Sequence, residues 1–454
     1  MIAILKREWK SYFQNITGWL FIAAVLALYG LYFLAYNLRA GYPYVSYTLS
    51  AISFIMLIAV PILTMRSMAE ERHSRTDQLV LTAPVSLGKM IFGKFLAMVG
   101  VFTVAVAVIA VTPLVLAAFG TVPMGENYVA VLGFWLYGCT CIAVGMLASA
   151  LTESQVIAAV VAFAFLFLGY MMNSITGLIG DHLITKVLGA YDLYTPLQSF
   201  MSGCLDLTGV VYFVSVTALC LFLTCQCVQK RRWSMTTKKL TTGMFSVAMI
   251  VVGFAVAVAV NMVVKEMPSS WTAVDATSTK LYSLTDTTKD YVKNLSQDVT
   301  IYVLSSEKSA DSTLAETLQR YEDLSKHLNV VYKDPAKSPN FYQQYTDSAP
   351  SQNSMIVVSD ARSRVVDYSD IYEYSYDYST YSSSVDGYDA EGQLTSALQY
   401  VTKADSELPV IYEITGHGEN TLSGGFSEAV EKANMTVSQL TLLTEDAVPD
   451  DAAV

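Results

Sequence analysis

Long apolar runs recur through the first part of the chain and stop near Lys265. Each run is long enough to cross a hydrocarbon core of about 30 Å as an α-helix. The runs lie at Gly18–Tyr36, Ser46–Met65, Phe95–Phe119, Val129–Leu151, Gln155–Ile175, Val210–Val228 and Met244–Val264. The pattern predicts a multi-span α-helical membrane domain of six transmembrane helices, followed by a seventh linking helix.

The stretch before the first run has the pattern of an amphipathic helix. Apolar residues recur at helical spacing with basic residues between them: Ile2, Leu5, Trp9 and Phe13, and Lys6, Arg7 and Lys10. This pattern is typical of a helix that lies in the membrane interface.

After Trp271 the pattern changes to short apolar strands that alternate with amphipathic helices. Strands are expected at Val299–Leu304, Leu328–Tyr332, Met355–Val358, Val410–Ile414 and Val437–Leu443. Helices are expected at Thr287–Leu295, Leu314–His327, Glu391–Thr402 and Phe426–Ala433. Such alternation predicts a soluble α/β domain with a mostly parallel sheet. The expected domains are therefore the membrane domain at 1–235, a linker with the seventh helix at 236–266, and the soluble domain at 267–454.

Composition agrees with this division. Of the 454 residues, 53% are hydrophobic and 15% are charged, whereas soluble domains have about 25% charged residues. Residues 1–264 carry a net charge of +6 and residues 265–454 a net charge of −17. All six cysteines lie in the first part, so no disulfide framework is expected in the soluble domain. The pairs Cys139/Cys141 and Cys225/Cys227 are not expected to share a metal ion, because residues two apart on a helix point about 200° apart.

Charge placement predicts the orientation. With the N-terminus in the cytoplasm, thirteen Lys and Arg residues fall on the inner side, and only Arg39 and Lys186 fall on the outer side. Basic residues concentrate on the cytoplasmic side of membrane proteins. We therefore expect a multi-pass protein of the cytoplasmic membrane, with residues 267–454 outside the cytoplasm.

The inner loop from Arg66 to Ala97 combines charged and apolar residues in a short space. Glu70, Glu71, Arg72 and Arg75 can form a polar helical surface at the end of the second span. An apolar patch at Leu79–Leu81 follows, and Pro84 is expected to break the helix. Such an element suits the docking of a soluble partner, and the alternative is a solvated loop whose charges only anchor the topology.

This loop resembles that of the permeases of type-2 ABC exporters, in which an EER segment followed by L-L-T-x-P-V-S and G-K precedes the third span. The matching residues are Glu70-Glu71-Arg72, Leu81-Thr82-Ala83-Pro84-Val85-Ser86, Gly88-Lys89 and Gly93-Lys94. The resemblance covers residues 1 to about 235, and it implies that the loop contacts a separate ATP-binding subunit and transmits its closure to the helices. It assigns this coupling role to Glu70, Glu71, Arg72, Leu79, Leu81, Pro84, Ser86 and Lys89.

Residues 88–95 almost spell a phosphate-binding loop, G-x-x-x-x-G-K-[ST]. Phe95 replaces the hydroxyl that would bind magnesium, and no strand precedes the segment. We therefore expect no cofactor on this chain, and ATP and Mg on a partner ATPase. The other expected partners are a second copy or a second permease, and membrane lipids, but no nucleic acid.

The soluble part resembles the Gld-type extracytoplasmic domain of gliding-motility transport systems, over roughly residues 244–454. The matching residues are Asp275, Thr277, Tyr282, Ser283, Leu284, Thr285 and Thr288 at its start, and Gly416-His417-Gly418-Glu419 later. The resemblance implies a permease fused to its Gld-type partner. Because the resembling family has another strand beyond the position of Val454, we expect a fragment.

Two features of the soluble part allow alternatives. Gly416, His417, Gly418 and Glu419 follow a strand and could form a ligand or metal site, or a structural turn that uses the glycines to bend. Residues 367–389 hold seven tyrosines and six acids, which could bind sugars or calcium, or form a tyrosine-rich hairpin or exposed loop.

These observations favour the permease subunit of an ATP-driven exporter over an enzyme. The substrate is unidentified, and an amphiphilic or lipid-linked molecule is favoured over an ion because no charge is evident within the spans. The alternative is a membrane-anchored scaffold that binds surface polymers or proteins without transport. A membrane enzyme is less favoured, because the four histidines form no recognised motif.

Overall fold

The computed structural model describes residues 2–75, 86–179, 188–230, 240–265, 267, 272–276, 283–307, 309–377, 382–403, 408–416, 418, 424–441, 448–449 and 452–453. These residues fall into two compact units, Met1–Lys280 and Leu281–Val454. Each unit is described by itself.

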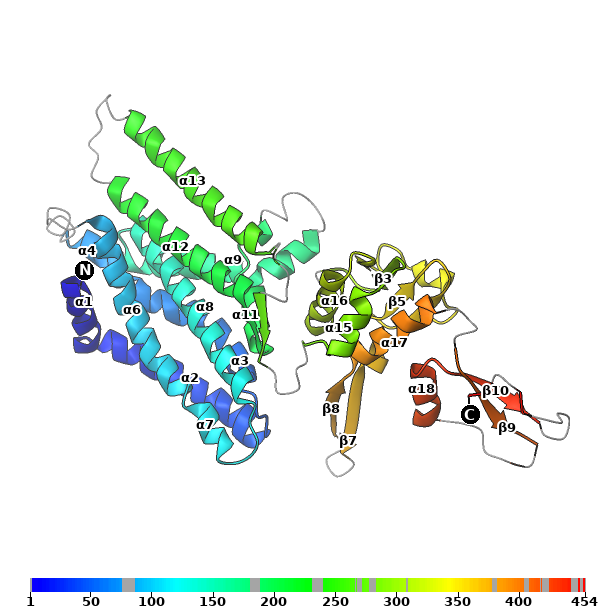
Figure 1. Cartoon of the computed structure of the whole chain (residues 1–454). Helices are drawn as coiled ribbons and strands as arrows, with labels where there is room; N and C mark the ends of the chain where they lie inside the picture. The colour runs from blue at the N-terminus through cyan, green and yellow to red at the C-terminus, as the bar shows by residue number, and fades with distance from the viewer. Residues whose placement is uncertain are drawn as a thin grey trace. The chain divides into compact units, whose positions relative to one another are not determined.

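The first unit is a helical bundle (Figure 1). Its helices are α1 (Ile2–Gln14), α2 (Ile16–Phe33), α3 (Ser46–Thr64), α4 (Arg66–His73), α6 (Leu87–Ile109), α7 (Thr112–Ala117), α8 (Met124–Leu151), α9 (Gln155–Ile179), α11 (Thr195–Met201), α12 (Leu207–Lys230) and α13 (Leu240–Lys265). A π-helical turn, Leu34–Arg39, extends α2. Among the described residues, seven helices are long and apolar enough to cross a membrane, which confirms the multi-span prediction.

The helices of the first unit differ in how deeply they are buried. Helix α8 lies at the centre and packs against α3, α9 and α12. Close approach depends on glycine, because a Cβ at Gly138 would lie 2.2 Å from Phe102 of α6. Helix α13 is peripheral, and Asn261 on it donates a hydrogen bond of 2.7 Å to Ser215 of α12.

Two short strands lie in the first unit at the ends of α12 and α13. Strand β1 (Cys204–Asp206) directly precedes α12, and β2 (Ala273–Asp275) follows α13. The two strands pair in antiparallel fashion, and the Ala276 amide donates a further hydrogen bond of 3.2 Å to the Gly203 carbonyl. The segment after α13 is thereby joined to the residues before α12.

The second unit is an α/β domain. Its central sheet has the order β4-β3-β5-β6, formed by β3 (Val299–Val303), β4 (Leu328–Tyr332), β5 (Met355–Val358) and β6 (Ser363–Val366). Three helices pack with this sheet: α15 (Asp286–Lys293), α16 (Ser312–Leu324) and α17 (Ala390–Thr402). Their apolar residues and those of the sheet form one buried core. A separate βαβ element comprises β9 (Val410–Ile414), α18 (Gly425–Lys432) and β10 (Thr436–Leu440), and its two strands are parallel.

The α/β class is confirmed, but the expectation of a mostly parallel sheet is wrong in its detail. Strand β3 is parallel to β4 and antiparallel to β5, and β5 is antiparallel to β6. The β5–β6 connection is a tight turn closed by a 2.9 Å hydrogen bond from the Ser359 amide to the Arg362 carbonyl. Such a short connection forces neighbouring strands to run in opposite directions.

The tyrosine-rich stretch forms a hairpin in its described part, as one of the alternatives predicted. Strands β7 (Tyr372–Asp377) and β8 (Ser382–Tyr388) pair in antiparallel fashion, with an irregularity between Glu373 and Tyr374. The hairpin extends from the body of the second unit (Figure 1).

Candidate functional site

The second transmembrane helix is broken where it leaves the bundle. Helix α3 contains Pro61, which has no backbone N–H, and α4 begins two residues after α3 ends. The hydroxyl of Ser149, on α8, accepts hydrogen bonds of 3.1 Å from the amides of Met68 and Ala69, and donates one of 3.0 Å to the Met65 carbonyl. The buried polar groups at the break are thus satisfied by α8, which fixes the direction of α4.

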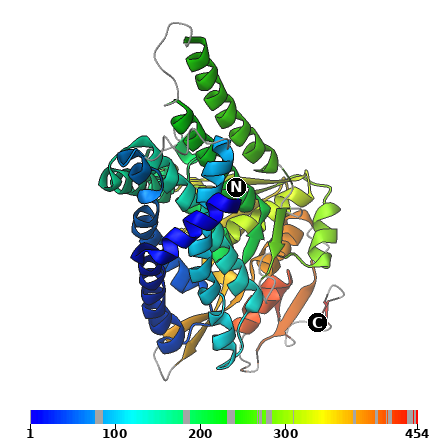
Figure 2. The ribbon, with the colours of Figure 1, turned by 90° about the vertical axis from the view of Figure 1, so that its left-hand side faces the viewer.

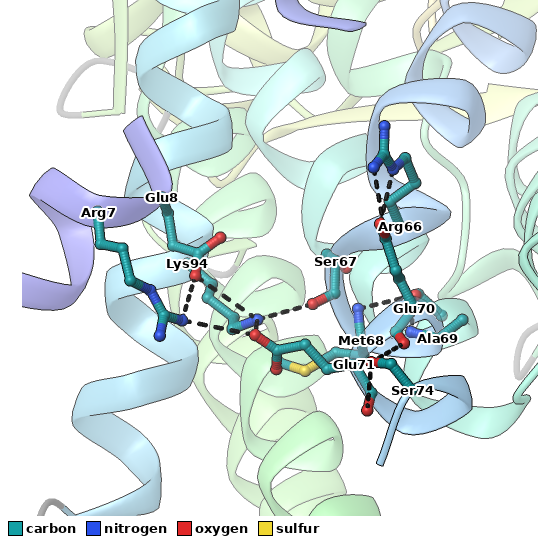
Figure 3. Close-up of polar contacts among 11 residues, drawn as sticks. Arg7, Glu8, Arg66, Ser67, Met68, Ala69, Glu70, Glu71, Ser74 and Lys94 are labelled. Atoms are coloured by element: carbon teal, nitrogen blue, oxygen red, sulfur yellow. Dashed lines mark hydrogen bonds and ion pairs between the residues drawn. The ribbon is translucent and has the colours of Figure 1, made fainter. Parts of the chain in front are cut away.

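A lysine with 3% side-chain exposure lies beside α4. The ammonium of Lys94, on α6, lies 2.6 Å from Glu71 Oε1 and donates a hydrogen bond of 2.9 Å to the Ser67 carbonyl (Figure 3). Glu8 Oε1, on α1, lies 3.9 Å from the same ammonium. A charge this deeply buried is tolerated only when it is paired and hydrogen-bonded.

Arg7 completes an alternating set of charges, which we call the four-residue ion network: Arg7, Glu8, Glu71 and Lys94. The Arg7 guanidinium lies 2.6 Å from Glu8 Oε1 and 3.5 Å from Glu71 Oε1. The hydrogen bond to Glu8 raises the pKa of Arg7 above its ordinary value, although partial burial opposes this. The network joins the amphipathic helix α1 to α4 and α6, and Figure 2 shows α1 (dark blue) lying across the outside of the bundle.

Two further ion pairs involve residues of α4, one within the helix and one to the connection that follows α8. Arg66 pairs with Glu70 through two hydrogen bonds of 2.7 and 2.9 Å, and it donates a third of 3.0 Å to Thr17 at the start of α2. Arg72 Nη2 lies 2.7 Å from Glu153 Oε1, in the connection that follows α8. Helix α4 is therefore tied to α1, α2, α6 and the end of α8, so a displacement of α4 would be passed to each of them.

The predicted site residues differ in their surroundings: some are ion-paired, some are exposed, and some lie outside the described residues. Glu70, Glu71 and Arg72 share α4 and are all ion-paired: Glu71 and Arg72 pair with residues outside α4, whereas Glu70 pairs with Arg66 of the same helix. Glu71 turns inward because Lys94 offers it a buried partner. Ser86 and Lys89, at the start of α6, are exposed. Leu79, Leu81 and Pro84 lie outside the described residues.

The predicted turn in the second unit is described only in part. Gly416 and Gly418 have φ angles of 115° and 88°, which disfavour residues with a side chain and fit a turn that depends on glycine. His417 and Glu419 lie outside the described residues.

Sequence reasoning missed Glu8 and the buried position of Lys94. Two signals could have found them. Glu8 is the one acid in an otherwise basic amphipathic segment, and Lys94 is followed by an apolar run that continues a helix beginning at Leu87. A lysine inside a transmembrane helix requires a partner, and acids at positions 8 and 71 could supply it.

Comparison with known families bears on this site. Residues 39–228 match the family model described as ABC-2 family transporter protein. The membrane unit contains an ABC-2 transporter domain. Residues 278–371 match a domain of unknown function (DUF7088), and no curated protein and no solved structure matches the chain.

The ABC-2 match includes α4 and α6, but it does not reach α1 or α13. Arg7 and Glu8 therefore bind the ABC-2 domain from a helix that precedes the matched residues. The second match overlaps the start of the region that resembles the Gld-type domain, and its description assigns it no function.

Proposed function

We propose that the chain is the permease subunit of an ATP-driven exporter of the cytoplasmic membrane. The match of residues 39–228 to the ABC-2 family carries this proposal, and it favours transport over a scaffold role. A separate cytoplasmic ATPase subunit binds ATP and Mg and hydrolyses the ATP. The permease works as a homodimer or with a second permease.

The coupling step follows from the connections of α4. The segment that links α4 to α6 receives the movement of the ATPase when ATP binding closes it. Helix α4 passes the movement to α1 through the ion pair of Glu71 with Arg7, and to α2 through the hydrogen bond from Arg66 to Thr17. It passes the movement to the end of α8 through the ion pair of Arg72 with Glu153. Helix α6 receives it directly, because Lys94 lies eight residues beyond Ser86 on the same helix.

The second unit lies outside the cytoplasm and acts as a Gld-type sensor, gate or handover site for the substrate. The cation distribution and the odd number of predicted spans support this location. The substrate class is amphiphilic or lipid-linked.

Affinity purification of the full chain from native membranes tests the proposal. We expect an ATPase subunit with a phosphate-binding loop to co-purify and to hydrolyse ATP. Charge reversal at exposed Lys89 should release it without disturbing the bundle, whereas Glu71 is a poor choice because it neutralises buried Lys94.

The matched control is charge reversal at Arg39, an exposed cation at the far end of α2. Arg39→Glu should retain the ATPase. Absence of any ATPase from the purified native complex would contradict the permease proposal, and equal retention by Lys89→Glu would remove Lys89 from the docking surface.

A further inference from the structure

A cavity of about 530 Å³, lined by residues of polar and charged type, lies between α1 and α4. Pockets that bind small molecules have volumes of about 300–1,000 Å³. All twelve residues that line the cavity are polar or charged, and six carry charge: Arg7, Arg66 and Lys94, and Glu8, Glu70 and Glu71. The ion pairs described above form part of the wall of the cavity, and Ser74, directly after α4, also lines it.

The cavity lies at the depth of the lipid headgroups. Asn15 and Thr17 line it at the junction between the interfacial helix α1 and the first span. Their neighbours Ile16 and Trp19 are 79% and 57% exposed, as expected of side chains that face lipid. Tryptophan favours the boundary between headgroups and hydrocarbon, which places the cavity beside a membrane leaflet.

The charged residues that line the cavity determine which kind of ligand can bind there. Three cations and three anions leave no net charge, so a ligand that is only anionic or only cationic meets as much repulsion as attraction. The lining charges are already paired with one another, and a ligand that carries both charges can join these pairs without leaving a net charge, its cation beside the carboxylates and its anion beside the cations. An ammonium group that retains its N–H donors can also hydrogen-bond to carboxylates, which a quaternary ammonium cannot do.

Ser67 adds a second observation. It lies in the cavity wall with 7% exposure, and its hydroxyl has no hydrogen-bond partner among the described residues. Its carbonyl is already engaged by Lys94. A buried hydroxyl without a partner is costly, and a phosphate oxygen would accept its hydrogen bond.

We propose that this cavity binds the headgroup of a zwitterionic phospholipid of the phosphatidylethanolamine class. The phosphate pairs with the lining cations and the Ser67 hydroxyl, and the ammonium pairs with the lining carboxylates. The bound lipid bridges α1 and α4, so it strengthens the attachment of the interfacial helix. This inference does not depend on ATPase docking or on transport.

Native mass spectrometry of the full chain, released from nanodiscs of equal phosphatidylethanolamine, phosphatidylcholine and phosphatidylglycerol, tests the proposal. We expect one retained phosphatidylethanolamine per chain, at about tenfold excess over either other lipid. Retention in the proportions of the nanodisc, or preference for phosphatidylglycerol, would overturn it.

Two substitutions on α1 locate the site. Ser11 lines the cavity and Gln14 does not, and both are exposed on the same helix. Ser11→Phe should fill the cavity and reduce retained phosphatidylethanolamine about tenfold, whereas Gln14→Phe should leave it unchanged. Equal retention by Ser11→Phe and the native chain would overturn the assignment.

A charge variant and a soluble competitor complete the test. Arg66→Gln should weaken retention, while Arg72→Gln should not, because Arg72 is absent from the cavity lining. Soluble phosphoethanolamine at the concentration of the lipid should displace none of it, because it lacks acyl chains that rest on the exposed apolar residues. Displacement would show that the ligand is a soluble zwitterion and would overturn the lipid assignment.

Discussion

Lys94 and Glu71 form an ion pair of 2.6 Å in which the lysine side chain is 3% exposed. The lysine comes from a transmembrane helix and the glutamate from the short helix α4. The pair therefore fixes the position of the residues that lead into the segment expected to meet the ATPase.

Removing one member of this pair should strongly destabilise the bundle. Glu71→Ala leaves a buried ammonium without its nearest carboxylate, and breaking a buried pair in this way costs about 3–5 kcal/mol. The loss would be measured as the free energy of unfolding in detergent. The double variant Glu71→Leu/Lys94→Met should recover most of it, and a double variant no more stable than Glu71→Ala would contradict this account.

A methyl group added at one position of α6 should displace a tryptophan of the interfacial helix. A Cβ at Gly100 would lie 1.7 Å from Cζ3 of Trp9, so Gly100→Ala should displace the indole and α1 with it. Tryptophan fluorescence and quenching would detect the change. Gly30→Ala is the control, because nothing lies within 4 Å of its added methyl group, and it should be neutral or stabilise by about 1 kcal/mol. Identical spectra for the native chain and Gly100→Ala would contradict the predicted displacement.

Although Thr285 of the second unit is exposed, we expect it to contribute strongly to the stability of that unit. Its hydroxyl caps α15, and its amide and hydroxyl donate hydrogen bonds of 2.8 and 2.7 Å to Glu391 of α17. Loss of the cap in Thr285→Ala should cost about 1–2 kcal/mol. Hydrogen exchange of the α15 amides would measure it, with exposed Thr287→Ala as the control. Equal exchange rates of the α15 amides in the two variants would show that Thr285 does not stabilise α15 as a cap.

Acid should loosen the turn around Asp367. Partial burial opposes its charge, but hydrogen bonds from Ser351 and Ser369 prevail and lower its pKa. Because the folded pKa is below the unfolded value of about 3.9, this stabilisation is complete above that value and is lost as the pH falls below it toward the folded pKa. Hydrogen exchange of the 351–369 amides between pH 6 and 3 would report the change. Asp367→Asn should remove the dependence, and an unchanged pH profile in that variant would assign it to another group.

The spans were predictable from sequence because run length and hydropathy decide membrane insertion. The environment of Glu71 was not, because a charge at the end of a span was assumed to face water, whereas Lys94 draws it inward. Strand positions such as Val299–Val303 were predictable from apolar composition. The direction of β6 relative to β5 was not, because it depends on the short connection at 359–362, which has no apolar pattern of its own.

Two of the motif residues predicted in the second unit have a structural role. Thr285 and Thr288 belong to the start that resembles the Gld-type domain, and both hydrogen-bond to α17. Their positions therefore reflect the packing of α15 on α17, which explains how a sequence motif at this point of the chain can be structural rather than catalytic.

The most direct test of the account is the side of the membrane on which the start of α6 lies. Ser86 and Tyr42 are both exposed, and they lie at opposite ends of the bundle because α3, a single span, runs between them. A membrane-impermeant thiol reagent applied to intact cells should label Tyr42→Cys and leave Ser86→Cys unlabelled, and inside-out vesicles should give the reverse. Labelling of Ser86→Cys from outside intact cells would place the coupling segment away from ATP and contradict the proposed function.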